Sequence, residues 1–92
     1  VVVIDDASRD ATAAAARSAD DGSGRLKVHR SRLNLGPAAA RNLALARSSA
    51  PLVAVLDADD AILPGRFAAL ADPQGDWDMS ADNIIFVAPE QA

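Results

Sequence analysis

The sequence predicts an α/β fold in which a mainly parallel sheet lies between layers of helices. Apolar, strand-like runs alternate along the 92 residues with Ala-rich stretches of helical composition. The links between them are short and contain Gly, Pro, Ser and Asp, which favour turns. A strand–helix–strand order with short links is built almost always as a right-handed crossover between parallel strands.

Two strands and one helix are expected in the first third of the chain. Val1–Ile4 is a continuous β-branched run, the pattern of a parallel strand buried on both faces. An Ala-rich helix should run from Asp10 to Ala19, with Ser8 as its N-cap and the Asp10 carboxylate in its first turn. Leu26–His29 alternates in polarity and predicts a short second strand.

Two further helices and two further strands are expected after these. Pro37 should open a helix that runs to about Ser48, because proline lacks an N–H that is unpaired at the first helical position anyway. Leu52–Leu56 is fully apolar and predicts a strand, and a third helix should run from Pro64 to about Ala71. Asn83–Val87 predicts the last strand, so the expected order is β-α-β-α-β-α-β.

The composition excludes several classes of protein. Half of the residues are hydrophobic, which is typical of a globular chain and not of a disordered one. A net charge of −4 argues against a general nucleic-acid binder, which would show a basic patch. The sequence contains no cysteine, so a disulfide framework and a thiolate metal site are excluded. No apolar run approaches the roughly 18–20 residues that cross a bilayer.

Two clusters of aspartates follow predicted strands: Asp5 and Asp6 after the first, and Asp57, Asp59 and Asp60 after the third. Ligands of open parallel sheets bind beyond the carboxyl ends of the strands, so both clusters should lie on one rim. Close carboxylates repel one another, and a Mg²⁺ or Mn²⁺ ion with oxygen ligands would relieve that repulsion. Helix capping explains the first cluster equally well, whereas capping does not require the second.

The third pattern is a tight turn that leads into a helix of small residues, from Asn34 to Asn42. The free N–H groups at the start of such a helix can bind an anion, and Arg41 lies one turn further along, beside Asn42. An ordinary capped helix with a solvated arginine accounts for the same residues. Both interpretations of this segment stay open.

Taken together, three motifs resemble family 2 of the glycosyltransferases, whose members have the GT-A fold. They are DDASRDAT at 5–12, NLGPAAARN at 34–42 and LDADD at 56–60, in the family's order and spacing. The resemblance implies a Rossmann-like three-layer sandwich. It makes residues 1–92 the nucleotide-sugar-binding part of a glycosyltransferase domain, truncated at both ends. The tail from Trp77 to Asn83 is similar to members that build bacterial exopolysaccharides such as succinoglycan.

The resemblance implies a nucleotide site made by two of the motifs. Asp6, with Asp5 beside it, would contact the base of the nucleotide, usually uracil. Arg41 and Asn42 would brace the nucleotide pocket from the helix. The implied reaction transfers a sugar from a nucleotide-diphosphate sugar, usually a UDP-sugar, to a saccharide or lipid-linked acceptor, with inversion of configuration.

The same resemblance implies a metal site in the third motif. Asp59 would bind a Mg²⁺ or Mn²⁺ ion that bridges the diphosphate. Asp57 would lie near the ribose, and Asp60 near the donor sugar or the metal shell. A cation at this place would neutralise the charge that develops on the leaving nucleoside diphosphate.

Two features of the family are missing from the sequence. One is the first strand, which ends in a PxYN-like motif and lies between the strands corresponding to Val1–Ile4 and Leu52–Leu56. An exposed strand edge at that place would favour self-association. The other is the acceptor half with its catalytic base, for which Asp82 is a poor candidate. Because the base is missing, we expect little turnover by these residues alone. We also expect a cytoplasmic protein, with the full-length enzyme at the inner face of the membrane.

A receiver domain of two-component signalling is the main alternative from another class. Asp5 and Asp6 would be its acidic pair and Asp57 its phosphorylated residue. Receivers also need a lysine on a later strand, and the one lysine of this sequence is Lys27. A non-catalytic folded segment that binds nucleotide weakly or not at all is the other alternative.

Overall fold

The computed structural model describes residues 1–71 together with Met79 and Ala81. The chain divides into two compact units, Val1–Val55 and Leu56–Ala92. The strand predicted at Asn83–Val87, Trp77 and Asp82 lie outside the described residues.

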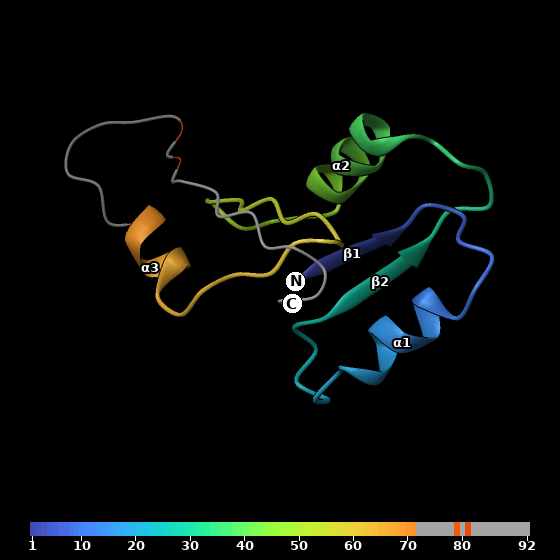
Figure 1. The fold of residues 1–92 in the computed structure, drawn as a ribbon, viewed down its shortest axis with the longest axis horizontal. Helices are drawn as coiled ribbons and strands as arrows, with labels where there is room; N and C mark the ends of the chain where they lie inside the picture. Colours follow the sequence, from blue (N-terminus) through green and yellow to red (C-terminus); the bar gives the residue numbers. More distant parts are fainter. Residues whose placement is uncertain (72–78, 80, 82–92) are drawn as a thin grey trace, which may run out of the picture. The chain divides into compact units, whose positions relative to one another are not determined.

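The first unit is built on a parallel pair of strands (Figure 1). β1 spans Val2–Asp5 and β2 spans Lys27–Arg30, one residue later than the sequence predicted in each case. Their register pairs Val2 with Lys27 and Asp5 with Arg30. Parallel pairing with a helix in the connection confirms the predicted α/β class for these elements and is compatible with part of a GT-A fold.

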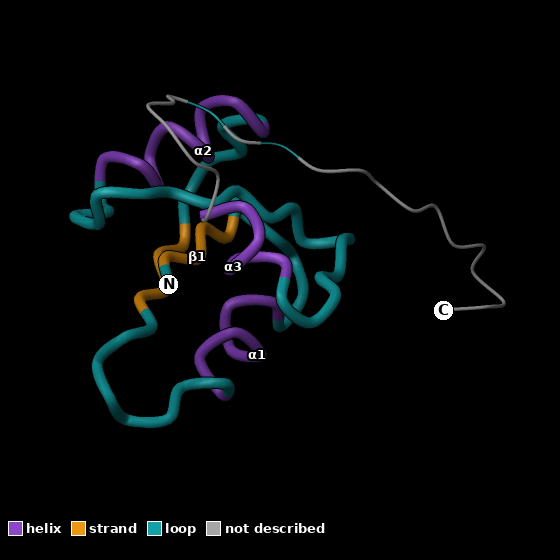
Figure 2. Tube along the Cα trace, turned by 90° about the vertical axis from the view of Figure 1, so that its left-hand side faces the viewer, coloured by secondary structure: helices purple, strands orange, loops and turns teal. Residues whose placement is uncertain are grey.

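Two helices lie on opposite sides of this strand pair in both Figure 1 and Figure 2. α1 spans Thr12–Ser18 and packs against both strands, whereas α2 spans Pro37–Ala46 and packs against β1. Most side chains on these helices are alanines, so each contact buries little apolar area. Among the described residues, Ala13 of α1 is the one buried hydrophobic side chain.

The predicted N-cap of α1 is wrong. The cap position is Ala11 and makes no side-chain hydrogen bond, because Ser8 lies in the preceding loop, where its N–H donates to Asp5. The Asp10 carboxylate instead accepts hydrogen bonds from the backbone N–H of Thr12, at 3.1 Å, and from the Thr12 hydroxyl. This local turn delays the start of the helix until Thr12.

The predicted start of α2 is confirmed, with Pro37 at its first position. Gly36 precedes it with φ 85°, a left-handed conformation that glycine adopts without steric cost. The helix ends at Ala46, two residues before the predicted end near Ser48. Helix ends of this kind are set by fraying as much as by sequence signals.

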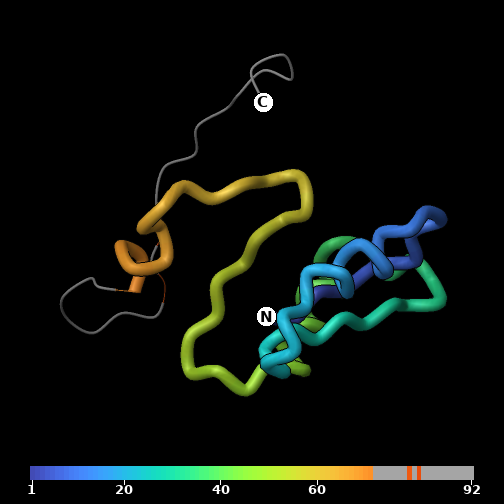
Figure 3. Tube along the Cα trace, turned by 90° about the horizontal axis from the view of Figure 1, so that it is seen from below, coloured from blue at the N-terminus to red at the C-terminus, as the bar shows by residue number. Residues whose placement is uncertain are grey.

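The predicted strand at Leu52–Leu56 is wrong, because the described part of the chain contains only β1 and β2 in its sheet. Residues 50–65 carry neither helix nor strand. In Figure 3 the tube of this segment, yellow-green to orange, runs without helical coils. Leu52 and Val55 each keep 57% of their surface exposed. A strand needs a hydrogen-bonded neighbour as well as a β-branched composition, and the described residues pair none with this segment.

The second unit contains α3, which spans Arg66–Ala71. The prediction that this helix begins at Pro64 is wrong by two residues. Gly65 adopts φ 82°, and the Arg66 N–H donates to the Leu63 carbonyl at 3.3 Å, which makes a turn before the helix. No helix in the described ranges is long and apolar enough to cross a membrane.

Candidate functional site

Asp5 lies at the end of β1 with its side chain fully buried. One carboxylate oxygen, Oδ1, accepts a hydrogen bond from the Ser8 N–H at 3.0 Å. The other, Oδ2, faces the Arg30 Nε at 3.5 Å and accepts no hydrogen bond within the described part of the chain. The Arg30 guanidinium also donates to the Ser8 carbonyl at 2.8 Å. Asp5 therefore ties the loop after β1 to the end of β2.

The same contacts favour the ionised form of Asp5. Hydrogen bonds from the hydroxyl and the backbone N–H of Ser8 hold the pKa of Asp5 below its ordinary value, against the opposing effect of burial. The positive charges of Arg30 and Arg17 lower this pKa further. Arg30 was not predicted from the sequence as a partner of Asp5. The signal that identifies it is the register of the parallel strand pair, which places Arg30 opposite Asp5.

Asp6 is half-buried and points across to the loop that precedes α2. Its Oδ1 accepts a hydrogen bond from the Leu35 N–H at 2.7 Å, and its Oδ2 accepts one from the Gly36 N–H at 2.9 Å. The Asp6 carbonyl also accepts a hydrogen bond from the side-chain amide of Asn34 at 3.5 Å. The first and second sequence motifs are thus brought into direct contact within the first unit.

The hydrogen bonds of Asp6 lie next to the anion site that the sequence predicted at the start of α2. The chain's own carboxylate occupies the N–H groups of Leu35 and Gly36, in the turn just before the helix at whose start an external anion was expected. Arg41 and Asn42 lie further along α2 at exposed positions. Their exposure keeps these two side chains accessible to a ligand.

Ala7 separates the two acidic residues from Ser8 and adopts φ 62°. This left-handed conformation is unfavourable for a residue with a Cβ atom and costs roughly 1–2 kcal/mol. Asp6 on one side and Ser8 on the other are both held by the hydrogen bonds described above. Contacts on each side therefore maintain the strained bend.

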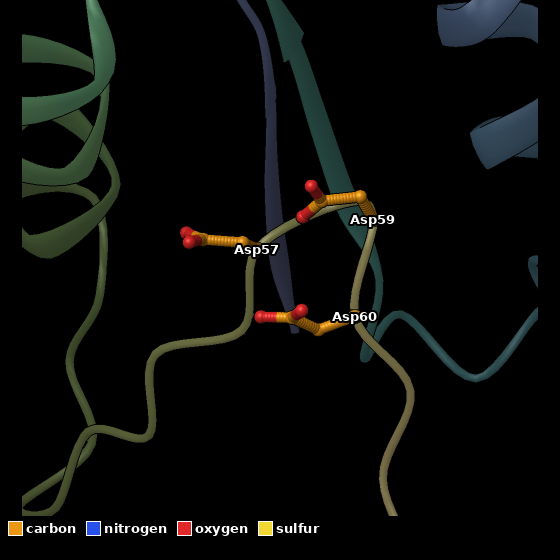
Figure 4. A group of neighbouring side chains, drawn as sticks. All are labelled: Asp57, Asp59 and Asp60. Carbon is orange, nitrogen blue, oxygen red and sulfur yellow. The ribbon is translucent and has the colours of Figure 1, made fainter. Parts of the chain in front are cut away.

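The third motif forms an acidic turn, Asp57–Asp60, in the second unit (Figure 4). The Asp60 N–H donates to the Asp57 carbonyl at 3.1 Å and closes the turn. One carboxylate oxygen from each of Asp57, Asp59 and Asp60 lies within 4.8 Å of the others, and all three residues are exposed. Oxygen ligands at this spacing suit a hard divalent cation, and their exposure leaves room for water or phosphate oxygens around it.

Each cluster of predicted site residues is therefore brought together inside its own unit. Asp5 and Asp6 meet the start of the second motif in the first unit, and the three acids of the third motif meet one another in the second. The shared rim expected for the two acidic clusters stays a prediction.

The chain is similar to proteins of sugar polymer synthesis. A family model described as "Glycosyl transferase family 2" matches residues 1–87. The chain is 58% identical over 92 residues to the succinoglycan biosynthesis protein ExoU of Rhizobium meliloti (strain 1021), covering 100% of this chain and 27% of ExoU. It is 35% identical over 91 residues to the succinoglycan biosynthesis protein ExoO of the same strain, covering 96% of this chain and 25% of ExoO. The chain thus spans about a quarter of these relatives. No solved structure matches it.

Proposed function

The chain belongs to glycosyl transferase family 2, and on that premise we propose that it carries the donor site of an enzyme that transfers a sugar from a nucleotide-diphosphate sugar. The observation that carries the proposal is the turn with the three carboxylates of Asp57, Asp59 and Asp60 within 4.8 Å of one another. Three exposed acids this close repel one another unless a cation or hydrogen-bond donors neutralise them. A sugar nucleotide with a bound divalent ion supplies that neutralisation.

Asp59 is the residue that would hold Mg²⁺ or Mn²⁺. Asp60 would lie in the metal shell or near the donor sugar, and Asp57 would lie near the ribose. The ion, when bound, would stabilise negative charge on the departing diphosphate. The protein's own part is to orient the oxygen ligands, which the hydrogen bond between the Asp60 N–H and the Asp57 carbonyl supports.

Asp6 would contact the base of the nucleotide, since this residue is only half-buried. Asp5 would support this contact indirectly, because its side chain is fully buried and bonds to Ser8 and Arg30. Arg41 and Asn42 would brace the nucleotide from α2, where both are exposed. A uracil base, and so a UDP-sugar, is the donor we propose.

In the proposed reaction an acceptor hydroxyl attacks the anomeric carbon of the donor. The new carbon–oxygen bond forms as the bond to the diphosphate breaks, a base takes the hydroxyl proton, and the configuration inverts. We assign that base to no residue of this chain, so we expect these residues alone to show little turnover. The names of the two relatives, both succinoglycan biosynthesis proteins, support an acceptor in bacterial exopolysaccharide synthesis. We further propose that this acceptor is saccharide or lipid-linked and that the full-length enzyme acts at the cytoplasmic face of the membrane.

A signalling receiver is disfavoured by the position of the lysine. Lys27 pairs with Val2 at the start of the strands, whereas Asp5 and Asp6 lie at their far end.

The self-association expected from an exposed strand edge stays a prediction, which sedimentation of the chain at several concentrations would test.

Calorimetric titration of UDP into the chain tests the donor site. We expect binding in the presence of Mn²⁺, loss of binding after addition of EDTA, and binding at least about tenfold weaker in an Asp59→Ala variant. Asp20→Ala is the matched control, because Asp20 is an exposed acid whose carboxylate accepts a local hydrogen bond from the Gly22 N–H at 3.0 Å. Equal binding with EDTA and in Asp59→Ala, or no binding by a folded chain, would contradict the proposal.

A further inference from the structure

The two carboxylate oxygens of Asp6 accept hydrogen bonds from two consecutive backbone amides. Oδ1 bonds to the Leu35 N–H at 2.7 Å and Oδ2 to the Gly36 N–H at 2.9 Å, across 29 and 30 residues of sequence. A charged acceptor makes stronger hydrogen bonds than a neutral one, and two parallel bonds also fix orientation. Asp6 thus fixes the loop in both position and direction.

The fixed loop leads directly into α2. Gly36 is the cap residue of that helix, and Pro37 is its first residue. A helix rises about 1.5 Å per residue, so Arg41 lies roughly 6 Å along the axis from Pro37. Because a hydrogen-bonded helix moves as one body, a displaced first turn carries Arg41 and Asn42 with it.

We propose that Asp6 is a positioning residue for Arg41 and Asn42, in addition to any contact with the base. This inference rests on the proposed nucleotide site. Without the carboxylate, the Leu35 amide loses the partner that the structure gives it, and the Gly36 amide keeps the Asn34 side-chain oxygen at 3.1 Å as its one partner among the described residues. Part of the effect of Asp6 on nucleotide affinity therefore passes through α2.

The hydrogen bonds are tested first, by NMR without any ligand. In the wild-type chain the amides of Leu35 and Gly36 should exchange with solvent at least about tenfold more slowly than those of Arg32 and Leu33. In Asp6→Asn, which keeps the shape but removes one acceptor oxygen, both amide protons should shift upfield and exchange faster. Asp20→Asn, with the same change of charge at another carboxylate bonded to a backbone amide, should leave them unchanged. Unprotected wild-type amides, or equal effects of the two variants, would overturn the proposal.

Positioning is then tested by a double-mutant cycle on the UDP affinity in Mn²⁺, using Asp6→Asn, Arg41→Ala and the double variant. If Asp6 acts through α2, its substitution should weaken UDP binding at least about fivefold more in the wild-type background than in the Arg41→Ala background. Additive effects would show that Asp6 acts independently of the helix and would overturn the proposal. Protected amides in a chain that binds no UDP would instead reject the proposed function while leaving the Asp6 bonds intact.

Discussion

Ala7 offers a test of the backbone geometry that does not depend on function. With φ 62° it adopts a left-handed conformation, which costs roughly 1–2 kcal/mol for a residue with a Cβ atom. Glycine avoids this cost but loses roughly 0.5–1 kcal/mol more backbone entropy on folding. The midpoints of these two ranges differ by about 0.75 kcal/mol, so Ala7→Gly should stabilise the fold by about 0.5–1 kcal/mol.

The measurement is urea unfolding followed by circular dichroism, with the free energy extrapolated to water. For a chain of this size the gain corresponds to a rise in Tm of roughly 2–8 °C. Ala14→Gly is the matched control, because Ala14 is an exposed residue inside α1 with ordinary helical geometry. The same substitution there should destabilise the chain by about 1 kcal/mol.

Opposite signs for these two substitutions are the critical result. If Ala7→Gly destabilises the chain as Ala14→Gly does, the bend after Asp6 is not left-handed and the reasoning fails. Ala7→Val provides a further check, since a β-branched residue tolerates this conformation even less and should destabilise the fold.

Two further predictions concern the acidic residues. The pKa of Asp5 is lowered in the folded chain, so the unfolded chain binds more protons in acid, and stability should be lost as the pH falls below about 4. Asp5→Asn should flatten the acid limb of the free energy of unfolding against pH, and an unchanged slope would contradict the role of this carboxylate. Mn²⁺ added without nucleotide should broaden the amide signals of residues 57–60 before those of residues 20–23, a second acidic loop. Equal broadening of both loops would indicate non-specific association.

Several elements could be predicted from the sequence because their signals are local. The β-branched run before Asp5 and the Pro37 that follows Gly36 act within a few residues, and both elements begin within a residue of the expected place. The acidic turn at Asp57–Asp60 is also local, since it is closed by one hydrogen bond across three residues. The proposal that this turn holds a cation therefore rests on residue type and spacing.

Other features depend on partners that are distant in the sequence. Ser8 is a good capping residue by type, but Arg30, 22 residues away, donates to its carbonyl, and Ser8 lies in the loop before α1 instead of capping it. Leu52–Leu56 has the composition of a strand but no paired neighbour among the described residues, and composition alone cannot supply one.

Asp5 and Asp6 show most clearly what the sequence alone cannot predict, because the folded chain gives these two neighbouring carboxylates different partners. By itself the sequence determined that two carboxylates stand at the end of a strand, as acids that could serve a cap or a ligand. The tertiary structure decided that Asp5 is buried against Arg30 and that Asp6 holds the amides of Leu35 and Gly36. The physical reason is that successive side chains at a strand end point in different directions, and the partner each one meets is set by the register and connections of segments about 25–30 residues away.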